Sequence, residues 1–474
     1  MNLTSHTSRL FFSLCILLTA AGLAAAERSK RPNILIVLVD DLGSQDLGCY
    51  GNRFIDTPNM DRLAADGMRW TQAYSACPVC SPSRVAEITG RSPARVRFTG
   101  HITAIDRHRW PKHGAILPPD DNLDIPLAEI TIAEALKPAG YTSVHVGKWH
   151  VGHQGFFPTD QGFNVNIGGD RNGAPASYFW PYKNRKRSVP VDGGKEGDYL
   201  TDHLTDKTLQ FIEEHKGGPF LVHFTPYAVH TPLQAPEELV AKYEKRAKKG
   251  QAADQASRIK PVYAAMVERM DSNLGRMLDK LDELGIADDT VVIFSSDNGA
   301  VATSSDNRPF RLGKANLYEG GVRVPLIIRW PGKTKPGSVS DAPTITEDLH
   351  ATIVDLVDGA KPAEVLDGRS LARDIKGNPP PAEEAELHWY WPHYVGKTGP
   401  GAAIRAGNWK LIDFYDPPRR ELYDLKNDVG EANNLSESNP KKAVELQSKL
   451  DAWLARVNPI RHRPNPDWTG LRKD

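Results

Sequence analysis

The stretch NILIVLVDD, residues 33–41, decides the fold class of this chain. Six aliphatic residues follow Asn33 without interruption, and Asp40 and Asp41 then end the run. A continuous apolar run is typical of a strand buried on both faces in a parallel sheet, because a half-exposed strand alternates apolar and polar residues. Three more runs have this form and also end at polar residues, at 142–146, 219–229 and 290–296.

Helical patterns lie between these apolar runs. The clearest covers residues 261–284, where apolar side chains recur on one stripe before Gly285, and shorter candidates cover 130–137 and 205–215. Strands that alternate with helices in this way predict an α/β fold, with a large mixed, mainly parallel sheet flanked by helices.

The pattern changes after about residue 378. The stretch NPPPAEEAE, 378–386, has the composition of a linker, and the residues beyond it indicate short antiparallel strands followed by a helix at 440–457. We therefore predict a large α/β domain over 27–378. A smaller C-terminal α+β domain, with a short antiparallel sheet and a helix, is expected over 379–474.

Charge and targeting signals limit the possible partners. The 474 residues carry 59 Lys plus Arg and 59 Asp plus Glu, so no overall field favours nucleic acid and we expect no such partner. Residues 1–26 combine an apolar run with three closing alanines, which predicts a secretory signal peptide, with a retained membrane anchor as the alternative. The mature chain is then expected to be periplasmic or extracellular and free of the membrane. Its oligomeric state has no signal in the sequence.

The polar residues that end the apolar runs form two chemical groups. Ligands bind beyond the carboxyl ends of the strands in open α/β sheets, so these residues are expected to meet at one edge. The first group offers only oxygen ligands, which suit Ca²⁺ with Mg²⁺ as the alternative; each pair alone could also be a turn or a helix cap. This group consists of Asp40, Asp41, Asp297 and Asn298.

The second group is cationic or able to donate protons. Together its members would neutralise a multiply charged tetrahedral anion, although each alone could be a surface charge or a loop residue. They are Arg84, Lys148, His150, His230 and Lys314.

The stretch CSPSRVAEITGR, residues 80–91, suggests where the nucleophile lies. Pro82 suits a first helical turn and Gly90 suits the position after a helix end, so a short helix is expected with Cys80 at its anion-binding amino terminus. The alternative is a buried, inert Cys80. Of the four cysteines, Cys15 leaves with the signal peptide; Cys49 and Cys77 could form a disulfide.

Cys80-Ser81-Pro82-Ser83-Arg84 followed by Thr89-Gly90-Arg91 resembles the signature of the type I sulfatases, in the alkaline-phosphatase-like superfamily. The likeness extends from Asp40-Asp41 through GKWH, HTP and SDNG to ELYDL near the C-terminus. In that family a separate maturation enzyme oxidises the signature cysteine to formylglycine. The hydrated aldehyde attacks sulfur, forms a covalent sulfo-enzyme intermediate and then expels sulfate.

The resemblance implies a role for each matching position. Ca²⁺ would be bound by Asp40, Asp41, residue 80, Asp297 and Asn298, and Asp297 could accept the diol proton. Arg84 would steady the diol. Lys148 and Lys314 would bind sulfate oxygens, His230 would protonate the leaving alcohol, and His150 would help the intermediate collapse.

This chain departs from the usual family pattern at two positions. Ile88 precedes the Thr-Gly-Arg element in place of leucine, and Glu87 precedes Ile88. Glu87 is expected to face solvent or to pair with a base. Two rival functions stay open, a formylglycine-dependent phosphonate or phosphate ester hydrolase and a non-catalytic secreted glycan-binding relative.

The expected substrate is a terminal O-sulfate on a glycan, with galactose-type sugars implied by family likeness and aryl sulfates as artificial substrates. The basic run 183–187 is interpreted as a solvated loop, with a contribution to anion binding as the alternative. HWYWPHY, 388–394, could line a sugar subsite or form the core of the small domain. Candidate subsite residues are Arg97, His101, Arg107, His108, Arg109, His388 and His393.

Overall fold

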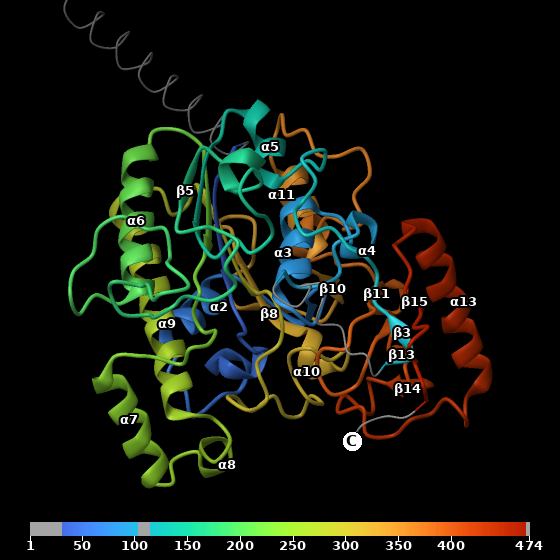
Figure 1. Ribbon diagram of the computed structural model, residues 1–474. Coiled ribbons are helices and arrows are strands. Elements are labelled where there is room, and N and C mark those ends of the chain that lie inside the picture. The colour runs from blue at the N-terminus through green and yellow to red at the C-terminus, as the bar shows by residue number, and fades with distance from the viewer. Residues whose placement is uncertain (1–30, 103–113, 471–474) are drawn as a thin grey trace, which may run out of the picture.

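A nine-stranded sheet forms the centre of the protein in the computed structural model, which describes residues 31–102 and 114–470 (Figure 1). The four strands expected from the apolar runs are adjacent and parallel, in the order β7-β1-β6-β4. They span β7 (Thr290–Ser296), β1 (Asn33–Val39), β6 (Phe220–Thr225) and β4 (Thr142–Gly147). β6 ends earlier than predicted because Pro226 has no N–H to donate to a neighbouring strand.

The outer strands make the sheet mixed, as predicted. β8 (Arg323–Arg329) runs antiparallel to β7 and to β2 (Met68–Tyr74). Parallel pairs add β9 (Ser338–Ser340) and β10 (Thr344–Ile345) to β2, and β5 (Val165–Ile167) to β4.

Helices cover both faces of the sheet, and alternate residues of β1 enter two separate cores. Leu35 and Val37 pack with α2 (Pro58–Asp66), α6 (Leu200–His215) and α9 (Pro261–Glu283). Ile34 and Ile36 pack in the core that contains α3 (Cys80–Thr89), α5 (Ile132–Leu136) and α11 (Glu347–Leu356). Figure 1 shows α6 and α9 on one side of the sheet and α3 and α11 on the other. This double burial explains the continuous apolar sequence of β1.

A four-stranded antiparallel sheet follows, and α13 (Pro440–Val457) covers one of its faces, as predicted. The sheet contains β11 (Glu386–Trp391), β12 (Gly401–Ala406), β13 (Trp409–Tyr415) and β14 (Pro418–Asp424). Its other face packs against the large domain, where Trp389 and Trp391 share a core with Val79 of the segment before α3. The aromatic segment is therefore core, and the boundary at residues 378 and 379 stays a prediction.

Shorter elements complete the described chain. β3 (Ile116–Leu117) pairs with β15 (Arg463–Pro464) near the C-terminus. The remaining short helices are η1 (Ser44–Asp46), η2 (Gly48–Tyr50), α4 (Pro93–Val96), η3 (Lys137–Ala139), η4 (Pro158–Gln161), α7 (Glu237–Lys248), α8 (Ala253–Ala256), α10 (Glu319–Val322), α12 (Ala372–Ile375) and η5 (Ala382–Glu384). Within residues 31–102 and 114–470, no helix has the length and apolar character needed to cross a bilayer. The predicted signal peptide lies outside the described residues.

Candidate active site

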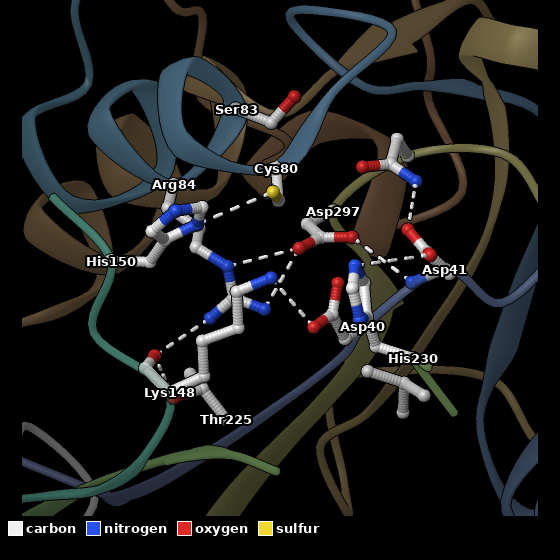
Figure 2. Close-up of polar contacts among 12 residues, drawn as sticks. Asp40, Asp41, Cys80, Ser83, Arg84, Lys148, His150, Thr225, His230 and Asp297 are labelled. Atoms are coloured by element: carbon white, nitrogen blue, oxygen red, sulfur yellow. Dashed lines mark hydrogen bonds and ion pairs between the residues drawn. The ribbon is translucent and has the colours of Figure 1, made fainter. Parts of the chain in front are cut away.

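Helix α3 begins at Cys80 and all ten of its residues are buried, which confirms the predicted short helix. Gly90 ends it in the left-handed conformation, with φ of 67°, and a Cβ there would lie 2.9 Å from the His350 ring. The Cys80 Sγ atom lies 3.4 Å from His150 Nδ1 (Figure 2). Burial raises the pKa of the Cys80 thiol, so the unmodified cysteine is a poor nucleophile near neutral pH.

The predicted oxygen ligands meet beside Cys80, at the carboxyl ends of β1 and β7 (Figure 2). Ligand atoms of Asp40, Cys80 and Asp297 all lie within 4.8 Å of one another. Asn298 Nδ2 donates a hydrogen bond to Asp41 Oδ1 at 2.8 Å, which turns the Asn298 side chain toward the same cluster.

The cluster fits a hard divalent cation. Asp40 Oδ1 and Asn298 Oδ1 are buried without a hydrogen-bond partner among the described residues, although buried oxygens are normally paired. Burial, followed by the charge of Asp297, raises the pKa of Asp40 well above its ordinary value. A bound cation would satisfy both oxygens and favour ionised carboxylates, and oxygen-rich sets of this kind suit Ca²⁺.

Arg84 and Lys148 compensate part of this negative charge. Arg84 Nε donates to Asp297 Oδ2 at 2.9 Å, its Nη2 lies 2.8 Å from the same oxygen as an ion pair, and its Nη1 donates to the Lys148 carbonyl at 2.8 Å. Lys148 Nζ donates to Asp40 Oδ2 at 2.7 Å. Gly147 makes this turn possible, since its φ is 107° and a Cβ would lie 2.2 Å from the Thr225 carbonyl oxygen.

Lys314 and His230 approach Asp41 on the open side of the cluster. Lys314 Nζ forms an ion pair with Asp41 Oδ1, and His230 Nε2 lies 3.7 Å from Asp41 Oδ2. Burial acts to raise the pKa of Asp41, but Lys314, His230 and Lys148 outweigh it and lower the pKa below its ordinary value.

Burial lowers the pKa of His230 and of His150, which favours their neutral forms near pH 7. Burial lowers the pKa of His230 to about 4, and burial followed by the charge of Lys148 lowers the pKa of His150 well below its usual range. An anionic sulfate group beside them would favour their protonated forms. All six predicted catalytic residues are thus brought to one place.

Glu87, one of the two positions that differ from the usual family pattern, belongs to a buried chain of hydrogen bonds between α3 and the sheet. The Glu87 carboxylate lies 2.9 Å from His223 Nε2, and His223 Nδ1 lies 2.9 Å from His145 Nδ1. His145 Nε2 donates to the Gly147 carbonyl at 3.2 Å, next to Lys148. Glu87 therefore pairs with a base, as expected. His145 and His223 were not among the predicted site residues; their signal in the sequence is an ionisable residue inside an apolar strand.

A cavity of about 450 Å³ opens over residue 80. Its lining includes Cys80, His101, His150, Arg187, His230 and Lys314. Of the candidate subsite residues, His101 therefore lies at the cavity. Arg187 was considered only as part of a basic loop.

The structure places three other subsite candidates outside the lining of this cavity. Arg97 is exposed after the end of α4 and does not line the cavity. His388 stacks on Trp453 of α13, with ring centroids 4.8 Å apart, because alternate residues of β11 face α13. His393 is buried, with Nε2 2.8 Å from Thr99 Oγ1. Arg107, His108 and Arg109 lie outside the described residues.

The cysteines of the described chain are not paired. Cys49, Cys77 and Cys80 are all free, so the considered disulfide between Cys49 and Cys77 is not formed.

Comparisons with known proteins agree with this site. The sulfatase family model matches residues 32–360, and the C-terminal model of N-sulphoglucosamine sulphohydrolase matches residues 311–458. An N-acetylgalactosamine-6-sulfatase of Canis lupus familiaris is 37% identical over 390 residues, which cover 77% of this chain and 70% of that protein. A sulfatase of Formosa agariphila is 29% identical over 521 residues, covering 95% and 93% of the two chains.

A solved structure extends the similarity to the whole fold. The crystal structure of Ps i-CgsB in complex with k-i-k-neocarrahexaose matches with a TM-score of 0.75 and 28% identity. The match covers 94% of this chain and 95% of that chain. The family model spans more than half of the sequence, and the chain therefore belongs to the sulfatase family of sulfuric ester hydrolases.

Proposed function

We propose that this protein removes a terminal O-sulfate group from a glycan and that residue 80, oxidised to formylglycine, is its nucleophile. The observation that carries the proposal is the convergence of Cys80, which lines the cavity, with Asp40 and Asp297, since ligand atoms of these three residues lie within 4.8 Å of one another. A glycan substrate is supported by two similar proteins, one named as an N-acetylgalactosamine-6-sulfatase and one solved with a neocarrahexaose.

The acidic cluster would hold one Ca²⁺ ion through Asp40, Asp41, Asp297 and Asn298, together with an oxygen of oxidised residue 80. The ion would supply a Lewis acid for the sulfate ester, and the hydrated aldehyde would supply a nucleophile whose second hydroxyl group can later release sulfate. The raised pKa of the Cys80 thiol supports a precursor role for the cysteine itself.

The other residues would bind the sulfate group and move protons. Lys148, which donates to Asp40, and Lys314, which pairs with Asp41 at the cavity, would hold sulfate oxygens, and Arg84 would fix the Asp297 carboxylate. Asp297 would accept a proton from residue 80. His230 would donate a proton to the departing alcohol oxygen, and His150, 3.4 Å from the residue 80 side chain, would take the second proton when sulfate leaves.

The proposal also includes export and maturation. The composition of residues 1–26 supports removal of a signal peptide, and the sequence around Cys80 would be read by a formylglycine-generating enzyme. Amino-terminal sequencing of the exported protein is expected to begin at Glu27, and a retained apolar segment would contradict this part of the proposal.

The decisive test measures free sulfate. The protein is coexpressed with a formylglycine-generating enzyme and incubated with a panel of sulfated mono- and oligosaccharides, including galactose-type sugars. Cys80→Ala is expected to abolish sulfate release, whereas the control Cys49→Ala changes a free cysteine outside the cavity and should retain activity. Full activity of Cys80→Ala, or hydrolysis of phosphonate esters with no sulfate release, would contradict the proposal.

A further inference from the structure

The outer wall of the cavity carries a cation that the sulfate site does not use. Arg187 lines the same cavity as Cys80, but it belongs to the loop between β5 and α6. No Asp or Glu lines this cavity within the described part of the chain. The cavity has the size of a site for a small ligand, so it offers room for the sugar beyond the sulfate group.

The backbone of Arg187 is held in place by a hairpin. Asn184 N donates to the Arg187 carbonyl at 2.8 Å, and Arg187 N donates to Asn184 Oδ1 at 3.0 Å. Lys183 and Ser188 form an antiparallel bridge across the hairpin. At its base, Val189 N donates to the carbonyl of buried Tyr182 at 3.2 Å. The position of Arg187 at the cavity is therefore built into the fold.

Among the residues that the structure describes, the guanidinium group of Arg187 has no carboxylate partner. The side chain is exposed and forms no ion pair with any acidic residue in the described ranges. The cations deeper in the site differ from it, because Arg84, Lys148 and Lys314 are each paired with an aspartate. Three cations thus face three carboxylates around residue 80, and the charge of Arg187 remains available to a ligand.

We infer that Arg187 is a specificity-determining residue that binds a second anionic group of the glycan, either another sulfate or a uronic acid carboxylate. This inference rests on the proposed function and names its substrate class, which is a multiply anionic oligosaccharide. A guanidinium group forms two parallel charge-assisted hydrogen bonds with sulfate or carboxylate oxygens. The neighbouring Lys183, Arg185 and Lys186 add positive potential around the same loop.

The kinetic test compares three substrates of equal length with the matured enzyme. One carries a single sulfate, one carries a second sulfate, and one carries a single sulfate and a uronic acid. Arg187→Ala is expected to lower kcat/KM for one or both doubly anionic substrates about 10- to 100-fold, mainly through KM, as expected for loss of a charge-assisted pair. Activity on the monosulfated substrate should stay within about twofold, since that substrate has no group for Arg187.

Two variants control for loop structure and for charge. Arg185→Ala removes an exposed cation from the same loop that does not line the cavity, and it should leave all three rates within about twofold. Arg187→Lys keeps the charge but loses the two-pronged geometry, so an intermediate loss is expected. An equal loss on all three substrates in Arg187→Ala, or no loss on any, would overturn the inference.

A binding measurement separates this inference from the proposed chemistry. Calorimetry with Cys80→Ala protein reports affinity for the same oligosaccharides without turnover. Arg187→Ala in that background is expected to weaken only the doubly anionic ligands, again about 10- to 100-fold. If the mature enzyme releases no sulfate but this difference is present, the proposed reaction fails and the inference stands. Equal affinities with and without Arg187 overturn the inference.

Discussion

Replacing Lys410 by methionine is expected to destabilise the contact between the antiparallel sheet and the segment that carries Lys314. Lys410 lies on β13, and its Nζ atom is 2.9 Å from Glu319 Oε1 and 2.9 Å from Glu431 Oε1. All three side chains are 0% exposed. Glu319 begins α10, and its backbone N–H donates a hydrogen bond to Glu431 Oε2 at 2.7 Å.

The expected loss of folding stability depends on which contacts Glu319 and Glu431 keep in the variant. Lys410→Met preserves most of the side-chain volume but leaves two buried carboxylates without their shared cation. Glu319 keeps Arg323 at 3.1 Å and the Tyr74 hydroxyl at 2.7 Å, so Glu431 carries most of the loss. Removal of one partner from a buried ion pair costs about 3–5 kcal/mol. Because burial raises the pKa of Glu431, protonation should make the loss smaller at acidic pH.

Urea unfolding followed by tryptophan fluorescence measures this loss. Lys449→Met is a matched control, because Lys449 pairs with Glu386 at the surface, where the two side chains are 41% and 40% exposed. The control should lose less than about 1 kcal/mol. Lys410→Met combined with Glu431→Gln is expected to recover part of the stability. A loss for Lys410→Met no larger than that of the control would refute the reasoning.

Three further predictions concern titration, geometry and metal. Burial raises the pKa of Glu347 from 4.5 to about 8, so ionisation of this carboxyl group destabilises the folded state. Wild-type stability should therefore fall relative to Glu347→Gln as pH rises from about 4.5 to 8, by up to about 5 kcal/mol in urea unfolding, and a pH-independent difference would argue against it. Arg84→Lys cannot keep the hydrogen bond and the second ion-pair contact with Asp297 together with the bond to the Lys148 carbonyl, so kcat should fall about 10²- to 10³-fold; a rate within about threefold of wild type would exclude this role. Removal of divalent cations with a chelator should lower both activity and Tm, with recovery on adding Ca²⁺, and a metal-free protein of full activity would disprove the metal assignment.

The centre of the fold was predictable because its signal is local. Residues 33–39 are buried on both faces, so their apolar character is continuous and can be recognised without a partner strand. The placement of Asp40 and Asp297 side by side then follows from a general rule about the carboxyl ends of parallel strands. The antiparallel direction of β8 depends on its contacts with β2 and β7. The apolar pattern of a single segment does not indicate the direction of its strand.

The substrate side of the site was less predictable because it depends on which face a residue occupies. His388 and Trp389 are adjacent in sequence, yet one faces α13 and the other faces the core shared with the large domain. Arg187 reaches the cavity from a loop without regular periodicity, so only the folded chain shows that it lies near Cys80. Glu87 pairs with His223, which is 136 residues away in the sequence, so only the folded chain shows this contact.

The most direct test of the central claim is a crystal structure of the matured, active protein grown with Ca²⁺, with an anomalous difference map. We predict one calcium peak about 2.3–2.6 Å from carboxylate oxygens of Asp40, Asp41 and Asp297, with an oxygen of oxidised residue 80 among its ligands. An active protein with an unmodified thiol at residue 80, or with its calcium ion away from these aspartates, would contradict the account.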